Sequence, residues 1–153
     1  MQRHRLVLSA FIIFFLSFTV FVLIKLVFQE DKLVAFTTDG CSYFPDGTFQ
    51  HDTLWQNCCT LHDLAYWQGG SFAEKLKADN ELKQCVTDVG HNAIGQLMAL
   101  GVIIGGSAYL PTSFRWGYGW PYLKQYGALS LDEEKQVNLL KPKLNLENSL
   151  PKE

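Results

Sequence analysis

Apolar residues are unevenly distributed along the chain, with one long uninterrupted segment near the N-terminus. Residues 6–24 contain no charged side chain and no proline, and they are preceded by Arg3 and Arg5. A helix of these nineteen residues would extend about 30 Å, enough to cross the hydrocarbon core of a membrane once. The pattern predicts an N-terminal transmembrane helix within residues 1–30.

The charges that flank this segment predict its orientation. Basic residues precede it, and Glu30 and Asp31 follow it, which orients the N-terminus toward the cytoplasm. We therefore expect a single-pass membrane protein whose remaining chain is exported to the periplasmic or extracellular side. The alternative is a secreted protein released by signal cleavage. We favour an uncleaved signal anchor, because residues 25–30 lack the small residues of a cleavage site.

Two segments in the middle of the chain have the apolar spacing of helices. The first is predicted to start at Asp52 or Thr53, which would cap it, and to stop at the Gln-Gly-Gly of residues 68–70. Residues 71–74 then read as a capping box that starts a second helix, which fades at Gly90. The short connection makes the two helices antiparallel neighbours.

The following stretch is apolar but interrupted by glycine. No Asp, Glu, Lys or Arg occurs between Val89 and Phe114. Residues 93–110 therefore fit a second membrane span, an interfacial helix or a helix packed on the preceding pair, and the glycines favour the last two. The aromatic residues within 114–122 indicate either a bilayer interface or a small aromatic core under a glycine-rich loop.

The C-terminal part is more polar. A short helix is predicted from Ser130 to Leu140, ended by Lys141 and Pro142, and residues 143–153 are expected to be disordered. We divide the chain into an anchor at 1–30, a helical domain at 31–126 with an apolar, aromatic C-terminal part, and a polar, partly disordered tail at 127–153.

Composition narrows the classes of function. The chain has 153 residues and a net charge of −2, so it is of one-domain size and has no basic excess for nucleic-acid binding. Its four cysteines would be exported to an oxidising compartment, where three pairings are open. Cys58 and Cys59 are adjacent and therefore poor partners for each other. An alternative is a zinc site at Cys58, Cys59 and His62, which oxidation of the thiols would prevent.

Candidate chemistry gathers around residues 58–66. If this stretch is helical, His62 and Asp63 diverge by about 100° around the axis, so the two side chains can serve different partners. Tyr66 follows His62 by one turn. A second acid, Asp79, lies six residues before Cys85 in the second predicted helix.

These motifs resemble the secreted phospholipase A2 superfamily. Residues 58–66 read Cys-Cys-x-x-His-Asp-x-x-Tyr, residues 79–85 read Asp-x5-Cys, and residues 39–42 form an Asp-Gly-Cys-Ser loop that is closest to the bacterial and fungal-type branch. The resemblance covers about residues 38–89. It implies a mainly α fold, in which two antiparallel disulfide-linked helices carry a His/Asp site beside a calcium-binding loop. The disulfides it implies are Cys41–Cys59 and Cys58–Cys85.

The resemblance also implies roles for individual residues. His62 would be the general base, Asp79 would orient it, and Tyr66 would bond to the same carboxylate. The side chains of Asp63 and Asp39 and the carbonyl of Gly40 would bind Ca²⁺. The expected function is calcium-dependent hydrolysis of phospholipid acyl esters, with the phospholipid membrane as both substrate and anchor.

Helix geometry supports the pairing of base and acid. In an antiparallel pair clamped by Cys58–Cys85, His62 lies four residues on from Cys58, about 6 Å along the axis. Asp79 lies six residues back from Cys85, about 9 Å in the same direction, so the two side chains can meet. The alternative function is a non-catalytic, disulfide-stabilised membrane or calcium-binding module on the same fold, which would not need His62, Asp63 or Asp79.

Overall fold

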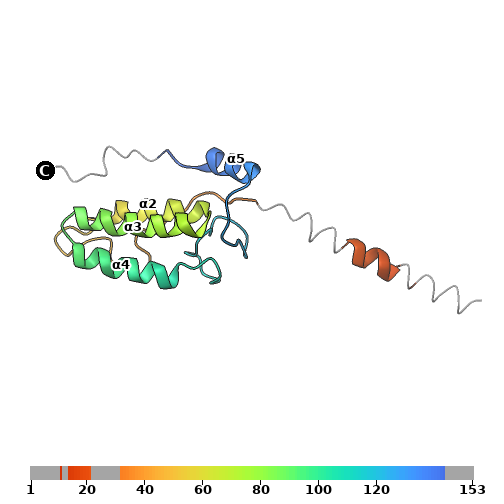
Figure 1. Ribbon diagram of the computed structural model, residues 1–153, viewed down its shortest axis with the longest axis horizontal. Coiled ribbons are helices and arrows are strands. Elements are labelled where there is room, and N and C mark those ends of the chain that lie inside the picture. The colour runs from red at the N-terminus through yellow and green to blue at the C-terminus, as the bar shows by residue number, and fades with distance from the viewer. Residues whose placement is uncertain (1–10, 12–13, 22–31, 144–153) are drawn as a thin grey trace, which may run out of the picture. The chain divides into compact units, whose positions relative to one another are not determined.

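The computed structural model describes residue 11, residues 14–21 and residues 32–143 (Figure 1). The chain divides into two compact units, Met1–Asp31 and Lys32–Glu153. The described residues form helices and loops without a strand, which confirms the prediction of a mainly α protein. Most of the tail that was expected to be disordered, residues 144–153, lies outside the described residues.

The predicted transmembrane segment also lies largely outside the described residues. Within it, residue 11 and residues 14–21 are helical. Among the helices that the structure describes, none combines the length and the apolar content needed to cross a membrane. The signal anchor and the domain boundaries at residues 30 and 126 stay predictions.

Helices α2 (Gln56–Gln68) and α3 (Phe72–Asp88) lie side by side and run antiparallel (Figure 1). The predicted capping box starts α3: Ser71 Oγ accepts a hydrogen bond from the Glu74 N–H, and the Glu74 carboxylate accepts one from the Ser71 N–H. These bonds satisfy backbone donors that a helix start leaves unpaired. The short connection between Gln68 and Phe72 makes the two helices antiparallel neighbours, as predicted.

The start of α2 differs from the prediction. Neither Asp52 nor Thr53 caps the helix, because the residues around them form turns, and the N-cap position is Trp55 without a side-chain cap. Trp55 is 3% exposed, and its indole N–H donates to the Pro45 carbonyl at 2.6 Å. A buried indole, rather than a polar cap, fixes where this helix begins.

Two disulfides link α2 to its neighbours, one to the preceding loop and one to α3. They join Cys41 to Cys59 and Cys58 to Cys85, which is the pairing that the family resemblance implies. The Cα atoms are 5.0 and 5.7 Å apart, within the ordinary range for disulfides. All four cysteine sulfurs are oxidised, so the alternative zinc site has no thiolate ligand.

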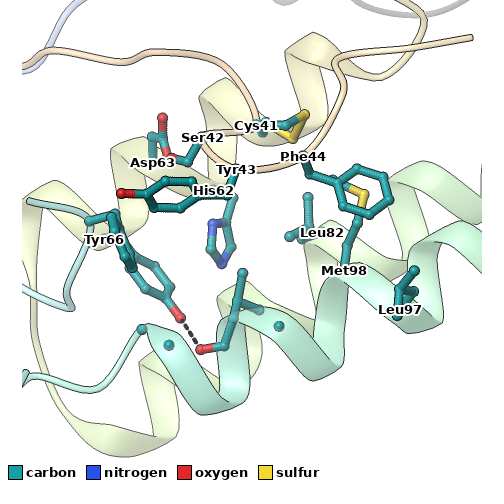
Figure 2. Close-up of a pocket in the computed structure, with 16 residues that line it drawn as sticks. Cys41, Ser42, Tyr43, Phe44, His62, Asp63, Tyr66, Leu82, Leu97 and Met98 are labelled. Carbon is teal, nitrogen blue, oxygen red and sulfur yellow. Dashed lines mark hydrogen bonds between the residues drawn. A yellow bond between two sulfur atoms is a disulfide. The ribbon is translucent and has the colours of Figure 1, made fainter. Parts of the chain in front are cut away.

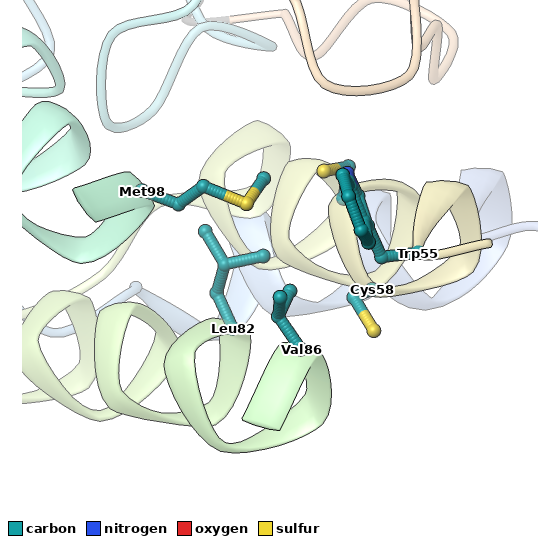
Figure 3. Packing of buried hydrophobic residues seen from close by; sticks show 6 residues of the cluster. Trp55, Cys58, Leu82, Val86 and Met98 are labelled. Carbon is teal, nitrogen blue, oxygen red and sulfur yellow. The ribbon is translucent and has the colours of Figure 1, made fainter. Parts of the chain in front are cut away.

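Helix α4 (Asn92–Gly105) packs along α3 and completes the main core. Figure 3 shows Met98 of α4 facing Leu82 and Val86 of α3. The buried cluster consists of Trp55, Cys58, Cys59, Leu82, Val86 and Met98. For residues 93–110, the structure therefore supports a helix packed on the preceding pair.

The aromatic segment 114–122 forms a core under a glycine-rich loop. Trp116 and Trp120 are 1% and 2% exposed, and their indole N–H groups donate to the carbonyls of Gly70 and Gln68. The buried Arg115 guanidinium donates to three backbone carbonyls of the same segment. Of the two alternatives for this segment, the structure shows the aromatic core, although Tyr122 remains exposed.

Helix α5 (Leu131–Leu140) occupies the predicted position in the C-terminal part. A second capping box, between Ser130 and Glu133, starts it, and Lys141 follows its last turn. Its buried residue, Val137, belongs to a cluster with Leu33, Leu64, Trp67 and Trp120. Part of the predicted polar tail is therefore folded and belongs to the core of the second unit.

Candidate active site

Helices α2 and α3 bring three predicted site residues together. His62 Nε2 lies 3.1 Å from Asp79 Oδ1, and the Tyr66 hydroxyl donates to the same oxygen at 2.7 Å. The three residues are between 2% and 8% exposed. The distance agrees with the prediction from helical rise and the Cys58–Cys85 link, because both side chains lie at the same height between the helices.

Burial and hydrogen bonding set the charges of this cluster. Burial lowers the pKa of His62 below its ordinary value, against the opposing effect of Asp79. Burial acts to raise the pKa of Asp79, but hydrogen bonds from His62, Lys75 and Tyr66 outweigh it and hold that pKa below its ordinary value. Burial and the neighbouring Asp79 raise the pKa of Tyr66, so its hydroxyl remains a donor. A neutral imidazole therefore faces an ionised carboxylate at neutral pH.

This arrangement leaves one imidazole nitrogen for chemistry. Because Nε2 is directed at Asp79, the neutral ring carries its proton there and Nδ1 is an acceptor. Nδ1 has no hydrogen-bond partner among the residues that the structure describes. His62 can therefore accept a proton through Nδ1.

His62 forms part of the wall of a cavity of about 480 Å³ (Figure 2). The cavity lies between the loop before α2 and helices α2, α3 and α4, and aromatic, aliphatic and glycine residues provide most of its surface. Its lining comprises Cys41, Ser42, Tyr43, Phe44, Cys59, His62, Asp63, Tyr66, Leu82, Leu97, Met98, Gly101, Val102, Gly105, Gly106 and Phe114. A largely apolar cavity with a few polar groups at one place is typical of a small-molecule site.

Two glycines of the α4 region shape this cavity differently. A Cβ on Gly106 would lie 2.4 Å from the Tyr66 hydroxyl oxygen, so this close approach requires glycine. A Cβ on Gly101 would meet nothing within 4 Å. Gly106 therefore allows α4 to approach Tyr66, whereas Gly101 leaves the cavity open.

A second, polar cavity of about 250 Å³ adjoins the first at Asp63, which lines both. Asp39 lines the polar cavity too, and none of the described residues around it is basic. The Thr38 hydroxyl donates to Asp63 Oδ2 at 2.6 Å, and the Ser42 hydroxyl donates to Asp39 Oδ1 at 2.9 Å. The structure thus places two of the predicted metal ligands around one space.

Asp63 is a largely buried carboxyl group, and no basic side chain that the structure describes lines the polar cavity beside it. Burial raises its pKa to about 7, opposed by the Thr38 hydrogen bond and reinforced by the negative charges of Asp39 and Asp46. A cation bound beside it would relieve this repulsion and favour the ionised form. The electrostatics therefore fit a cation in the polar cavity.

The available donors indicate which cation would fit. In the described part of the chain, no cluster of three or more His, Cys, Asp or Glu residues could hold a metal. Two carboxylates would need hydroxyl, carbonyl or water oxygens to complete the coordination, and such an all-oxygen shell suits Ca²⁺. Gly40 does not line this cavity, so its carbonyl as a ligand stays a prediction.

Gly40 has a clear structural requirement. Its φ is +77°, and a Cβ there would lie 2.4 Å from Asp46 Oδ1. The same Asp46 oxygen accepts a hydrogen bond from the Cys41 N–H at 2.7 Å. The loop therefore closes around the Asp46 carboxylate, a role that the sequence did not predict, and only glycine fits at position 40.

Lys75 is a further residue of the site that the sequence did not predict. Its ammonium group is buried and donates to Asp79 Oδ2 at 2.7 Å. The spacing of four residues on one helix was the available signal. Lys77 and Glu81 share that spacing on the exposed surface of α3, so spacing alone did not distinguish the buried pair.

Comparisons with known proteins add no assignment. No protein-family model matches the chain, and searches of curated proteins and of solved structures find no significant match.

Proposed function

We propose that this protein hydrolyses phospholipid acyl esters in a calcium-dependent reaction, with His62 activating the attacking water. The observation that carries the proposal is the 3.1 Å contact between Asp79 and His62, a histidine that lines a largely apolar cavity. The motif resemblance across residues 38–89 adds the substrate class. Such a cavity suits an acyl chain, and His62 suits a base that acts on an ester at its end.

The proposed chemistry assigns a separate task to each residue of the cluster. His62 Nδ1 accepts a proton as water attacks the ester carbonyl carbon. Asp79 holds the proton of Nε2, which fixes the tautomer, and its charge offsets that of the imidazolium. Tyr66 fixes the Asp79 carboxylate through the 2.7 Å bond. Positioned base catalysis of this kind contributes on the order of 10²- to 10⁴-fold.

Asp63 and Asp39 are the proposed calcium ligands. Asp63 lines both cavities, so a cation held there would adjoin the space in which the ester lies. Bound calcium would supply polarisation of the ester carbonyl and stabilisation of the developing oxyanion. His62 and Asp63 are consecutive in α2, which supports a base and a metal ligand acting on one substrate.

A phospholipid surface is the proposed partner. Helix α4 carries no charged residue, and its outer side chains Leu100 and Ile104 are 58% and 76% exposed. Tyr43 and Leu97 are exposed and also line the apolar cavity. An exposed apolar surface that continues into the cavity supports direct transfer of a lipid from a membrane.

Vesicles of a phospholipid with two different fatty acids test the proposal. We expect the purified protein to release one fatty acid when calcium is present and none when it is chelated. His62→Gln should abolish release, while the matched control His51→Gln, at an exposed histidine, should retain it. Calcium or vesicle binding without any release would instead support the alternative, a non-catalytic module on the same fold.

A further inference from the structure

Lys75 is a buried cation directly behind the proposed catalytic pair. The residue is 2% exposed and lies in the first turns of α3, one turn before Asp79. Its ammonium group donates to Asp79 Oδ2 at 2.7 Å and to the Val102 carbonyl of α4 at 3.2 Å. A lysine is rarely buried unless it is paired, because desolvating its charge is costly.

The two oxygens of Asp79 have different partners. Oδ1 faces His62 and accepts the Tyr66 hydrogen bond, whereas Oδ2 accepts from Lys75. Bonds to both oxygens fix the rotation of the carboxylate group. Without the bond to Oδ2, the group could turn and offer His62 a different geometry.

Lys75 and Tyr66 also share a partner outside the pair. Tyr66 donates to the Val102 carbonyl at 3.3 Å, and the same carbonyl accepts from Lys75 at 3.2 Å. The Lys75 ammonium group lies 5.3 Å from the centre of the Tyr66 ring. Both residues that hold Asp79 are therefore fixed to α4, which forms the cavity wall.

We propose that Lys75 is a positioning residue, which holds the Asp79 carboxylate so that Oδ1 faces His62 and fixes the His62 tautomer. The proposal rests on the proposed function for its effect on turnover, but its effect on the imidazole does not depend on turnover. If the buried ion pair only stabilised the contact between α3 and α4, its loss would change neither turnover nor the tautomer of His62.

Lys75→Met tests this by removing the ammonium group while keeping an unbranched apolar side chain. We expect kcat for ester hydrolysis to fall about 10- to 100-fold, as for other residues that orient a catalytic ligand, with KM changed less than about threefold. The ¹⁵N chemical shifts of the His62 imidazole at pH 8 should indicate one tautomer in the parent protein and a mixture of both tautomers in the variant. Lys75→Gln keeps a neutral hydrogen-bond donor, so its effects on kcat and on the tautomer should be smaller than those of Lys75→Met. It serves as the test if the methionine variant does not fold.

Two controls separate positioning from stability. Lys77→Met removes an exposed lysine of the same helix and should change nothing. Val86→Ala opens the core without touching the ion pair, so it should lower thermal stability and leave kcat and the His62 tautomer unchanged. An unchanged tautomer in folded Lys75 variants would overturn the proposal. If the parent protein hydrolyses no ester but the tautomer shifts, the proposed function fails and the positioning role stands.

Discussion

At the scale of single residues, the candidate site separates two tasks between consecutive side chains of α2. His62 bonds to Asp79 of α3, and Asp63 bonds to Thr38 of the loop before α2. Consecutive residues on a helix point about 100° apart, so one side chain can hold a proton while the other faces a cation. Both line the apolar cavity, where the two tasks would meet on one substrate.

The raised pKa of Asp63 predicts how calcium and pH affect stability. Its pKa rises from 3.8 to about 7 on folding, so the folded protein holds a proton that the unfolded chain has lost between those values. Calcium-free stability should therefore fall as pH rises from about 4 to about 7, because ionising Asp63 is disfavoured in the fold. Calcium should restore the loss above pH 7.

Thermal melts of Asp63→Asn test this prediction. At pH 8 without calcium, the variant should melt at a higher temperature than the parent, because it buries no charge. It should gain nothing from added calcium. Asp52→Asn, at an exposed acid, is the matched control and should behave like the parent. A lower melting temperature for Asp63→Asn in calcium-free buffer would contradict the electrostatic account of this site.

His62 and Asp79 were predictable from the sequence, whereas the residues that hydrogen-bond to the site, Thr38 and Lys75, were not. Helical rise, together with the Cys58–Cys85 disulfide that the family resemblance implies, places His62 opposite Asp79. Thr38 and Lys75 carry no distinguishing pattern, because hydroxyls are common in loops and lysines are common on helices. Their importance arises only from burial, which depends on the packing of α3, α4 and the loop.

At the scale of secondary-structure elements, α4 acts as the wall that shapes the apolar cavity. Gly101 lies in that wall with open space where a side chain would extend. We expect Gly101→Leu to keep the fold, since it replaces a poor helix former with a good one, a gain of up to about 1 kcal/mol. The leucine side chain would occupy cavity volume and so exclude long acyl chains.

Rates on esters of different chain length test the role of Gly101. The hydrolysis rate of Gly101→Leu should fall at least about tenfold on long-chain phospholipid vesicles and stay near the parental rate on short soluble esters. Gly101→Ala adds one methyl group and should show a smaller change in the same direction. Equal rates of Gly101→Leu and the parent on every chain length would show that the cavity is not where the acyl chain binds.

The Cys58–Cys85 bond is the clamp that aligns α2 with α3. Replacing both cysteines by alanine should lower the free energy of unfolding by about 2 to 5 kcal/mol, measured by chemical denaturation. Hydrolysis should fall as well, because His62 and Asp79 lose the link that sets their relative height. Peptide mapping of the parent should find Cys58 joined to Cys85. A Cys41–Cys58 peptide would instead require a different alignment of the two helices.

Some element boundaries follow local rules and others follow packing. The capping boxes of α3 and α5 were readable in sequence, since each involves residues three apart. The start of α2 was not, because burial of Trp55 decides it. Residues 114–122 fit two environments equally well from sequence. Only the structure shows that the carbonyls of Gln68 and Gly70, at and just after the end of α2, accept hydrogen bonds from two buried indoles.

At the scale of the whole molecule, the chain combines a folded helical unit with an N-terminal segment that we predict to be a signal anchor. Mass spectrometry of the mature protein should find residues 1–24 retained, and the protein should resist extraction by carbonate. An N-terminus near Glu30 would instead establish a cleaved signal peptide and a secreted protein. Replacing residues 1–30 by a cleavable signal peptide provides the control, because that variant should still be exported but released from the membrane, while the second unit keeps its disulfides.

Calcium binding and lipid hydrolysis, measured side by side in two variants, distinguish the proposed roles of His62 and Asp63. By calorimetry and fatty-acid release, His62→Gln should bind calcium nearly as the parent does and hydrolyse nothing, because the imidazole is not a proposed ligand. Asp63→Asn should lose calcium binding and hydrolysis together. Full hydrolysis by His62→Gln, or hydrolysis by the parent that a calcium chelator does not affect, would contradict the assignment of His62 as base and Asp63 as metal ligand.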